Sequence, residues 1–288
     1  MDLSIIIVNW NTRDYLHRCL ESIRRNPPTD EFEVVVVDNA SSDGSADMVR
    51  SRYGGEVTLI ANDRNAGYAK GNNQGIEAAR GEYILLLNPD TEVKTFALDN
   101  LLGFAKDHPE AAAVGCRLVG TDYQVQLSCR SFPYPLAILF EYTRLSRIFP
   151  WSRFFSAYRM TWFDHAHEME VDQPMGSCLL LSRKAIEDIG VFDTDFPIFF
   201  NEVDWCYRAK QKGWKIYFIP DAEVVHLGGA STRQCRPEMI KESHRSLKRF
   251  YEKHYKSRIP GPVYWFIMAA ISINSFFSSR LKSIGKSK

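Results

Sequence analysis

A short apolar run that ends abruptly in Asn-Pro-Asp constrains the fold of this chain more than any other feature. Residues 83–87 read Tyr-Ile-Leu-Leu-Leu, and Asn88, Pro89 and Asp90 follow at once. A continuous apolar run bounded by a turn is typical of a strand buried on both faces, as in a parallel sheet. Pro89 has no N–H for a ladder hydrogen bond, so the strand should end there. Asp90 is therefore expected just beyond the carboxyl end of a central strand, where open α/β sheets bind ligands.

A carboxylate in that place has two interpretations. It can bind a hard divalent cation through oxygen, and the cation can bridge phosphates. It can equally cap a turn or the next helix. The segment alone does not decide between them. The same holds for Asp38, which follows a second apolar run and precedes the polar residues Asn39, Ser41 and Asp43.

Apolar runs and helical periodicities alternate through the first 110 residues, which predicts an α/β fold with parallel pairing and right-handed crossovers. We expect strands at 3–8, 33–37, 57–61, 83–87 and 112–118. We expect a first helix that Thr12 caps and Pro27 ends, and a second that ends at Arg52. A third should begin at 65 and extend past 79, and a fourth should span 98–106. The rhythm then breaks at residues 132–163, a stretch dense in aromatic residues and Arg that suggests a helical insertion. Beyond it we expect strands at 176–182, 215–219 and 222–226, and helices at 183–189, 204–212 and 237–255.

Charge and cysteine usage limit the setting in which the chain works. The net charge is +1, but residues 241–288 carry eleven Lys or Arg against two Glu. A basic tail indicates an anionic partner, and we expect a membrane surface rather than nucleic acid. The six cysteines contain no CxxC pair and no zinc spacing, so reduced core thiols in a cytoplasmic protein are expected. We expect no secretory signal, because Asp2 stands where the start of such a signal would be basic.

Several weak motifs gain weight from their order. The chain contains Ser4-Ile-Ile-Ile-Val-Asn-Trp-Asn11, Val36-Val-Asp-Asn-Ala-Ser-Ser-Asp-Gly-Ser45, Asn65-x-Gly-Tyr-Ala-x-Gly-Asn-Asn73, Leu86-Leu-Asn-Pro-Asp90, Gly176-Ser177, Phe200-Asn-Glu-Val-Asp-Trp-Cys-Tyr-Arg208 and His226-Leu-Gly-Gly-Ala-Ser231. In this succession, over residues 3–232, the chain resembles the family 2 glycosyltransferases, and most closely bacterial rhamnosyltransferases. The Gly67, Gly71 and Gly75 spacing lacks P-loop and dinucleotide signatures and is better explained by close helix packing.

The resemblance implies a GT-A fold, in which a mostly parallel, Rossmann-like sheet is flanked by helices. Residues 1–118 would form the nucleotide-sugar-binding half, residues 119–236 the acceptor-binding and catalytic half, and residues 237–288 a helical, membrane-associating appendage. It also implies inverting transfer of a sugar from a nucleotide diphosphate, usually with Mg²⁺ or Mn²⁺. The donor would be dTDP-rhamnose or a UDP-sugar, and the acceptor a glycan or a polyprenyl-diphosphate-linked sugar in cell-surface polysaccharide synthesis.

Carried over to this chain, the resemblance assigns the donor site to the residues Asn9, Asn11, Asp38, Asn39, Ser41, Asn65, Gly67, Asn72, Asn88 and Asp90. Asp38 matches the residue that recognises the base. Asp90 matches the last position of the metal motif, whose first position is here the neutral Asn88. His226 matches a histidine that completes the metal site, although a lone histidine after an apolar strand is more often a core residue.

The general base is expected at Glu202. It matches the second acid of the family's Glu-Asp pair, whose first acid is here Asn201. Asp204 lies two residues on, and residues two apart do not share a helix face, so only one of the two acids should point at the acceptor. We assign catalysis to Glu202 and support to Asp204, which would cap the helix or bind Arg208. The reverse assignment stays open.

Two other classes of protein compete with this interpretation. Asn88 and Asn201 leave fewer acids than the family pattern, which would suit a degenerate nucleotide-sugar-binding protein without turnover. An oxidoreductase on a similar sheet is disfavoured, because no GxGxxG follows the first strand. The Gln-x-x-Arg-Trp motif of processive synthases is absent, which favours single additions.

The C-terminal segment 263–277 is apolar but short. A spanning helix needs about 20 residues, and Ser272, Asn274 and Ser275 interrupt this one. Lys253, Lys256 and Arg258 precede it and Arg280, Lys282, Lys286 and Lys288 follow it. We therefore expect a helix that lies on the inner face of the cell membrane, with residues 132–163 as a second contact. A core or dimer helix is the alternative.

Overall fold

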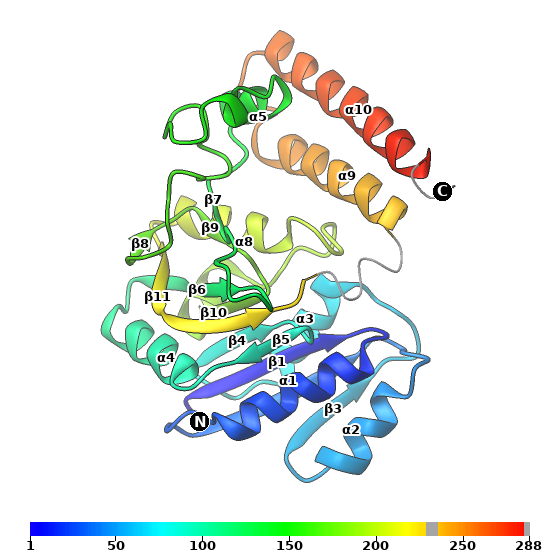
Figure 1. The fold of residues 1–288 in the computed structure, drawn as a ribbon, viewed down its shortest axis with the longest axis vertical. Coiled ribbons are helices and arrows are strands. Elements are labelled where there is room, and N and C mark those ends of the chain that lie inside the picture. Colours follow the sequence, from blue (N-terminus) through cyan, green and yellow to red (C-terminus); the bar gives the residue numbers. More distant parts are fainter. Residues whose placement is uncertain (229–235, 285–288) are drawn as a thin grey trace.

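A nine-stranded, mostly parallel sheet forms the centre of the molecule (Figure 1). The computed structural model describes residues 1–228 and 236–284. The strands lie in the spatial order β3-β2-β1-β4-β10-β6-β11-β5, and β8 pairs with β11. Their bounds are β1 (Leu3–Asn9), β2 (Phe32–Asp38), β3 (Val57–Ala61), β4 (Tyr83–Leu87), β5 (Thr91–Val93), β6 (Ala111–Val119), β8 (Met169–Glu170), β10 (Cys178–Ser182) and β11 (Lys215–His226).

The parallel strands of the first half agree with the alternating pattern of the sequence, whereas the second half departs from it. β10 is antiparallel to both of its neighbours, β4 and β6. The chain leaves β6 at its carboxyl end and returns to that edge after the insertion, so β10 enters the sheet in the opposite direction. The two strands expected at 215–219 and 222–226 are one strand, β11, whose register against β6 shifts between Ile219 and Glu223.

Both faces of the sheet are covered by helices. On one face, Leu3, Ile5 and Ile7 of β1 pack in a core shared with α1 (Arg13–Arg25), α2 (Ser45–Tyr53) and α4 (Ala97–Asp107). On the other face, Ile6 and Val8 share a core with α3 (Tyr68–Ala78), α7 (Arg183–Ile189) and α8 (Asn201–Gln211). Because side chains alternate along a strand, a strand buried on both faces is apolar throughout, as the sequence of β1 is.

Two local features hold the strand ends in place. A Cβ added at Gly75 would lie 2.4 Å from Ile6 Cγ2, and one at Gly71 would lie 2.8 Å from Val8 Cγ1, so the glycines of α3 serve close packing on β1, as predicted. Thr12 precedes α1 but does not cap it. Its hydroxyl donates instead to Asn9 Oδ1 at 2.6 Å, which fixes the amide at the end of β1.

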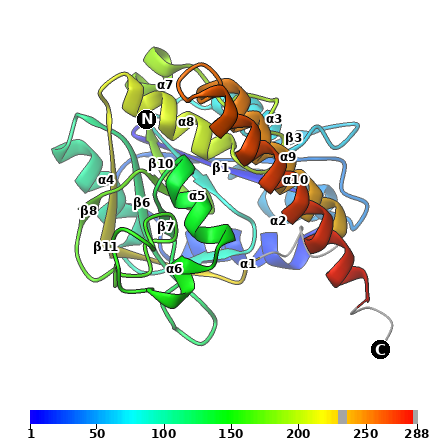
Figure 2. The same ribbon diagram turned by 90° about the horizontal axis from the view of Figure 1, so that it is seen from above.

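A second layer lies over the face of the sheet that α3 and α8 cover (Figure 1). It contains α5 (Pro135–Tyr142) and α6 (Leu145–Ile148) of the insertion, together with α9 (Arg236–His254) and α10 (Gly261–Ile284). Seen from above, α9 and α10 run side by side, and α10 also contacts α5 (Figure 2). Between this layer and the sheet, β7 (Cys129–Arg130) and β9 (Gln173–Pro174) form a small antiparallel sheet. Across 1–228 and 236–284, no helix combines the length and hydropathy needed to cross a bilayer.

Candidate active site

A cavity of about 640 Å³ opens where strands β1, β2 and β4 end. Its walls come from both halves of the chain. The strand-end wall contains Asn9, Asn39, Asn65, Gly67, Tyr68, Asn88 and Asp90, together with their neighbours Ser177 and His226. The other lining residues from the second half of the chain, here called the facing wall, include Ser128, Arg130, Tyr158, Gln173, Glu202, Met239 and Ser243.

Asp90 and His226 meet in this cavity although 136 positions separate them in the sequence. His226 Nε2 lies 3.7 Å from Asp90 Oδ1, and the two side chains are only 10% and 6% exposed. The pairing of β5 with β11 sets this approach, because Thr91 and His226 are register partners. Burial lowers the pKa of His226, while the Asp90 charge acts in the opposite direction. A buried, neutral imidazole and a carboxylate thus face the same space.

Gln126 fixes which imidazole nitrogen faces Asp90. Its Nε2 donates to the backbone oxygen of His226 at 2.8 Å, so its Oε1 is the atom 2.9 Å from His226 Nδ1. Nδ1 must then carry the proton, which leaves a lone pair on Nε2. An imidazole oriented in this way by an outer partner is the usual form of a metal-ligating histidine. No local pattern points to Gln126, which lies 100 positions before His226.

Asn88 has a different environment from Asp90. Its Oδ1 accepts a hydrogen bond from the Tyr68 hydroxyl at 2.9 Å, and the same hydroxyl lies 3.2 Å from the Gly176 oxygen. Tyr68 thus ties the start of α3 to the end of β4. Burial raises the pKa of Tyr68, and the charges of Glu202 and Asp90 contribute to the increase. The phenol therefore stays protonated and remains a donor.

Asp38, to which the resemblance assigns recognition of the base, lies beside the cavity rather than in its lining. It is 2% exposed and is not among the described residues that line the cavity. Its Oδ1 accepts from Asn9 Nδ2 at 2.8 Å and its Oδ2 from the backbone N–H of Ser41 at 2.9 Å. Asp38 therefore holds the loop behind the wall, and the next residue, Asn39, lines the cavity in its place.

The remaining residues assigned to the donor site fall into two groups. Asn9, Asn65 and Gly67 line the cavity, whereas Asn11, Ser41 and Asn72 support it from outside its lining. The Ser41 hydroxyl accepts a hydrogen bond from the backbone N–H of Asn11 at 2.9 Å, and Asn72 Nδ2 donates to the backbone oxygen of Tyr68 at 3.0 Å. Asn11 and Ser41 thus hold the two loops that contain them together, and Asn72 stabilises the first turn of α3.

Glu202 lies in the cavity at the start of α8. Phe200 precedes the helix with a φ of 69°, a left-handed conformation that is costly for a bulky residue and that turns the chain sharply into the helix. Burial raises the pKa of Glu202 to about 7, and hydrogen bonds from backbone N–H groups oppose the increase only in part. The Glu202 carboxyl is thus close to half ionised at neutral pH.

Asp204 faces away from the cavity. It is fully buried, its Oδ1 lies 2.7 Å from both Lys253 Nζ and His254 Nε2, and its Oδ2 accepts from Arg208 Nε at 2.8 Å. Burial alone would raise the pKa of Asp204, but the hydrogen bonds from His254 and Lys253 and the Arg208 charge outweigh it, so the pKa is lowered. Asp204 joins α8 to α9. Asn201 is also buried and donates to the Ile198 oxygen at 2.8 Å.

Comparison with known proteins shows the family to which the chain belongs. Residues 4–190 match the model of glycosyl transferase family 2. The chain belongs to this family. A relative from Mycobacterium tuberculosis, described as N-acetylglucosaminyl-diphospho-decaprenol L-rhamnosyltransferase, is 27% identical over 96% of this chain and 93% of its own length. The low-salt glycan biosynthesis hexosyltransferase Agl10 of Haloferax volcanii is 26% identical over 78% of this chain and 67% of its own length.

Solved structures of glycosyltransferases share the fold. The mannosyltransferase PcManGT from Pyrobaculum calidifontis, in complex with GDP-Man and Mn²⁺, has a TM-score of 0.61 at 20% identity, over 93% of this chain and 68% of that one. GalNAc-T7 with UDP, GalNAc and Mn²⁺ has a TM-score of 0.61 at 16% identity, over 94% of this chain and 54% of that one. The predicted GT-A fold, with its mostly parallel sheet flanked by helices, is confirmed.

Proposed function

We propose that this family 2 glycosyltransferase inverts the anomeric configuration of a sugar as it transfers it from a dTDP- or UDP-sugar, with rhamnose favoured, to a hydroxyl of a glycan or lipid-linked acceptor. The observation that carries the proposal is the shared cavity. It presents the Asp90–His226 pair on one side and Glu202, a carboxyl with a pKa of about 7, on the other. The relative named as a rhamnosyltransferase supports rhamnose as the sugar.

The donor lies against the strand ends in this proposal. Asn39, rather than Asp38, is the side chain positioned to contact the base, because it lines the cavity. Its Nδ2 donates to the Gly67 oxygen at 3.1 Å and its Oδ1 accepts from Asn62 at 2.8 Å, so its orientation is fixed before the donor binds. Asp38 then acts as a positioning residue, through Asn9 and the backbone of Ser41.

The Asp90–His226 pair fits a divalent cation that binds together with the donor diphosphate. One carboxylate oxygen and one imidazole lone pair supply two ligands, and no third His, Cys, Asp or Glu joins them among the described residues. Mg²⁺ and Mn²⁺ commonly use one or two protein ligands and complete their shells with phosphate oxygens and water. The imidazole favours Mn²⁺ over harder ions. When bound, the cation would neutralise charge on the leaving diphosphate.

Glu202 takes the proton of the acceptor hydroxyl as that hydroxyl attacks the anomeric carbon. The carbon–oxygen bond to the diphosphate breaks on the opposite face, so a single displacement inverts the configuration. A general base works best when its pKa is close to the working pH, and typically contributes about 10²–10⁴-fold. The contacts of Asp204 support Glu202 as the base, since Arg208, Lys253 and His254 hold the Asp204 carboxylate and none of the three lines the cavity.

We also propose that the enzyme lies peripherally on the inner face of the cell membrane, where a polyprenyl-linked acceptor resides. α10 buries Tyr264, Ile267 and Ile271 but exposes Trp265 by 67% and Phe266 by 63%. The insertion exposes large apolar side chains next to it, namely Leu136, Ile148, Trp151 and Phe154. Exposed apolar surface of this extent on two adjoining elements marks an interaction surface.

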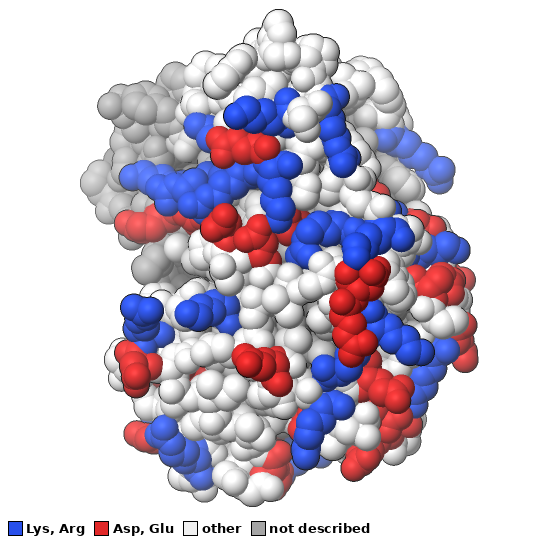
Figure 3. All heavy atoms as spheres, turned by 180° about the vertical axis from the view of Figure 1, so that it is seen from behind, with Lys and Arg blue, Asp and Glu red and all other residues white. Residues whose placement is uncertain are grey.

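Charges around this surface suit an anionic leaflet. On the face shown in Figure 3, the upper end of the molecule is largely uncharged, and below it Lys and Arg gather together with some Asp and Glu. Arg144 and Arg147 are exposed beside the apolar residues of the insertion. Two of the expected basic residues are used differently: Lys253 pairs with Asp193, and Arg258 donates to Tyr207 and Gln211. Lys286 and Lys288, and the side chains of Phe276, Phe277, Arg280 and Lys282, lie outside what the structure describes.

Binding of nucleotide sugars to the purified protein tests the donor half of the proposal. A specific donor at about 100 times its dissociation constant should stabilise the fold by about 2.7 kcal/mol. We expect this thermal shift for a dTDP- or UDP-sugar in the presence of Mn²⁺. Asp90→Ala and His226→Ala should each raise the Mn²⁺ concentration needed, whereas Asp99→Ala, on α4 and outside the cavity lining, should not. Equal shifts in chelator for all four proteins would contradict the metal site.

A further inference from the structure

Two buried hydroxyl groups in the cavity have no hydrogen-bond partner. Ser128 and Ser177 are 3% and 2% exposed, and neither Oγ is paired. Leaving such a group unsatisfied costs roughly 1–3 kcal/mol, so unpaired hydroxyls in a cavity wall point to ligand contacts. Ser177 belongs to the donor end, because its backbone oxygen accepts from the N–H of Asn88 at 2.9 Å. Ser128 belongs to the opposite wall.

Arg130 follows Ser128 in the same wall and is the one Lys or Arg among the described lining residues. No carboxylate in the described part of the chain lies within ion-pair distance of it, and its guanidinium lies 5.8 Å from the centre of the Tyr158 ring. A half-buried guanidinium that faces a cavity without an acidic partner is suited to a phosphate, which it can bind through two parallel hydrogen bonds.

Arg130 lies on the same segment as Gln126, the residue that orients His226. Gln126 contacts His226, and Arg130 lies four residues further along this segment, a reach of up to about 14 Å. Burial raises the pKa values of Tyr68 and Tyr158, and the Glu202 charge contributes to both. Tyr158, the ring beside the Arg130 guanidinium, is thus within electrostatic reach of Glu202 as well.

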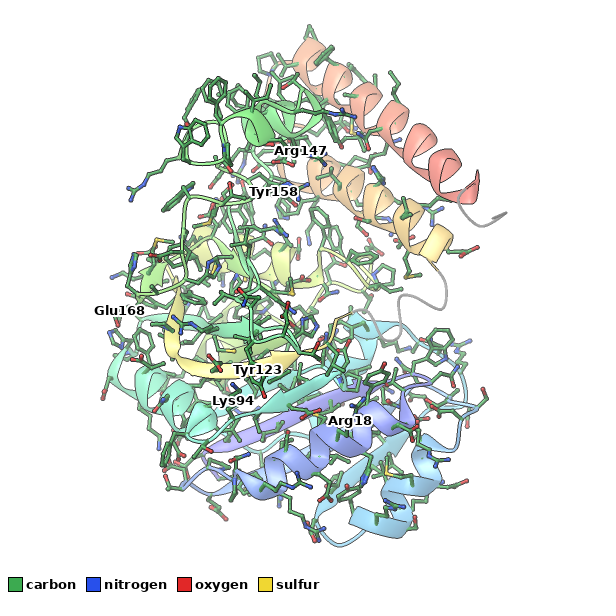
Figure 4. All side chains as sticks on the ribbon, in the orientation of Figure 1. Arg18, Lys94, Tyr123, Arg147, Tyr158 and Glu168 are labelled. Atoms are coloured by element: carbon green, nitrogen blue, oxygen red, sulfur yellow. The ribbon has the colours of Figure 1, made fainter. Side chains whose placement is uncertain are left out.

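Tyr158 also connects this wall to the surface layer. It lies below α5, where the insertion meets the body of the molecule, and Arg147 lies above it on the side of α5 (Figure 4). α9 contributes Met239 and Ser243 to the same cavity. A ligand with its sugar at Glu202 and its phosphates at Arg130 would thus leave the cavity toward α5, α9 and α10.

We propose that Arg130 and the Ser128 hydroxyl form a phosphate subsite for a diphosphate-linked acceptor, on the far side of Glu202 from the donor. This inference rests on the proposed function. The subsite would hold the acceptor's anomeric phosphate so that a hydroxyl elsewhere on the same sugar ring faces Glu202. The diphosphate of the donor is the other source of the same chemistry, and the experiment must separate the two.

Equilibrium binding of two matched probes tests the subsite. The first is N-acetylglucosaminyl diphosphate bearing a short alkyl chain, and the second is the same alkyl N-acetylglucosaminide without the diphosphate. We expect the wild-type protein to bind the first at least tenfold more tightly. Arg130→Ala should reduce that ratio to about one, and Ser128→Ala should reduce it less. Arg130→Lys should retain part of it, because a point charge replaces a bidentate donor.

The dissociation constant of dTDP-rhamnose with Mn²⁺, measured on the same proteins, identifies the phosphate. It should change less than twofold in Arg130→Ala, and the control Arg153→Ala, an exposed residue over Trp162 outside the cavity lining, should match wild type with every ligand. Equal binding of both probes by the wild-type protein would overturn the subsite. A loss of donor affinity as large as the loss of probe affinity would assign Arg130 to the donor. Failure of the proposed function differs from both, since the wild-type protein would then bind no nucleotide sugar.

Discussion

At the scale of single residues, the ionisation of Glu202 should set the pH dependence of transfer. Only the carboxylate can accept a proton, and burial raises its pKa to about 7. The rate constant kcat/KM should therefore rise about tenfold per pH unit below that value and level off above it. A profile measured from pH 5 to 9 checks this. A flat profile across the range would remove Glu202 as the base.

The same pKa makes a prediction about stability. An acid whose pKa is raised in the folded state costs nothing below its unfolded value near 4.5 and destabilises the fold increasingly as pH rises through 7. Glu202→Gln should thus raise the free energy of unfolding by roughly 1–3 kcal/mol at pH 8 and leave it unchanged at pH 4. Denaturant unfolding at both pH values measures it, and an equal effect at the two would contradict the buried carboxylate.

Asp204 should behave in the opposite way. Its pKa is lowered, so its contribution to stability is present above the unfolded pKa and is lost as pH falls through the folded one. Asp204→Asn should lower the free energy of unfolding by roughly 2–4 kcal/mol at neutral pH, because it leaves Lys253 and Arg208 without their shared acid. Urea unfolding checks this. A variant as stable as wild type with no activity would restore Asp204 as a candidate base.

The sequence predicts the position of a site residue where its neighbours in the chain determine that position. Asp90 could be placed because an apolar run and a proline fix where β4 ends. Asp38 and Asn39 could not be told apart, since neighbouring residues at the end of a strand point to opposite sides and the motif does not say which side holds the ligand. The role of Asp204 depended on His254, 50 positions later and on another helix, which no local pattern reveals.

At the scale of elements, α10 and the insertion should act together as the membrane-binding surface. Trp265→Ser combined with Phe266→Ser should reduce binding to anionic liposomes tenfold or more. The variant lacks two large apolar side chains whose transfer from water into the membrane favours binding. Phe96→Ser, which removes an equally exposed ring at the start of α4, should not reduce binding. Flotation at low salt measures this. Equal flotation of all three proteins would assign α10 to another partner.

Most elements of the first half could be predicted from the sequence, and the second half less well. Strand and helix alternate regularly up to β6, and each boundary carries a glycine, a proline or a polar cluster. β10 could be predicted as a strand but not as antiparallel, because its direction depends on where the insertion returns the chain. β5 was missed, since three residues that pair with β11 carry no periodic signal.

At the scale of the whole molecule, the proposed function requires one cavity to bind the donor, hold the acceptor and move the proton. Acceptor-dependent release of nucleoside diphosphate tests this most directly. Purified protein would be given a panel of dTDP- and UDP-sugars, N-acetylglucosaminyl-diphospho-decaprenol and Mn²⁺. We predict equimolar diphosphate and glycosylated lipid from wild type, and a rate at least 100-fold lower from Glu202→Gln at unchanged donor affinity. Donor binding without transfer by wild type, or wild-type rates from Glu202→Gln, would contradict the proposed function.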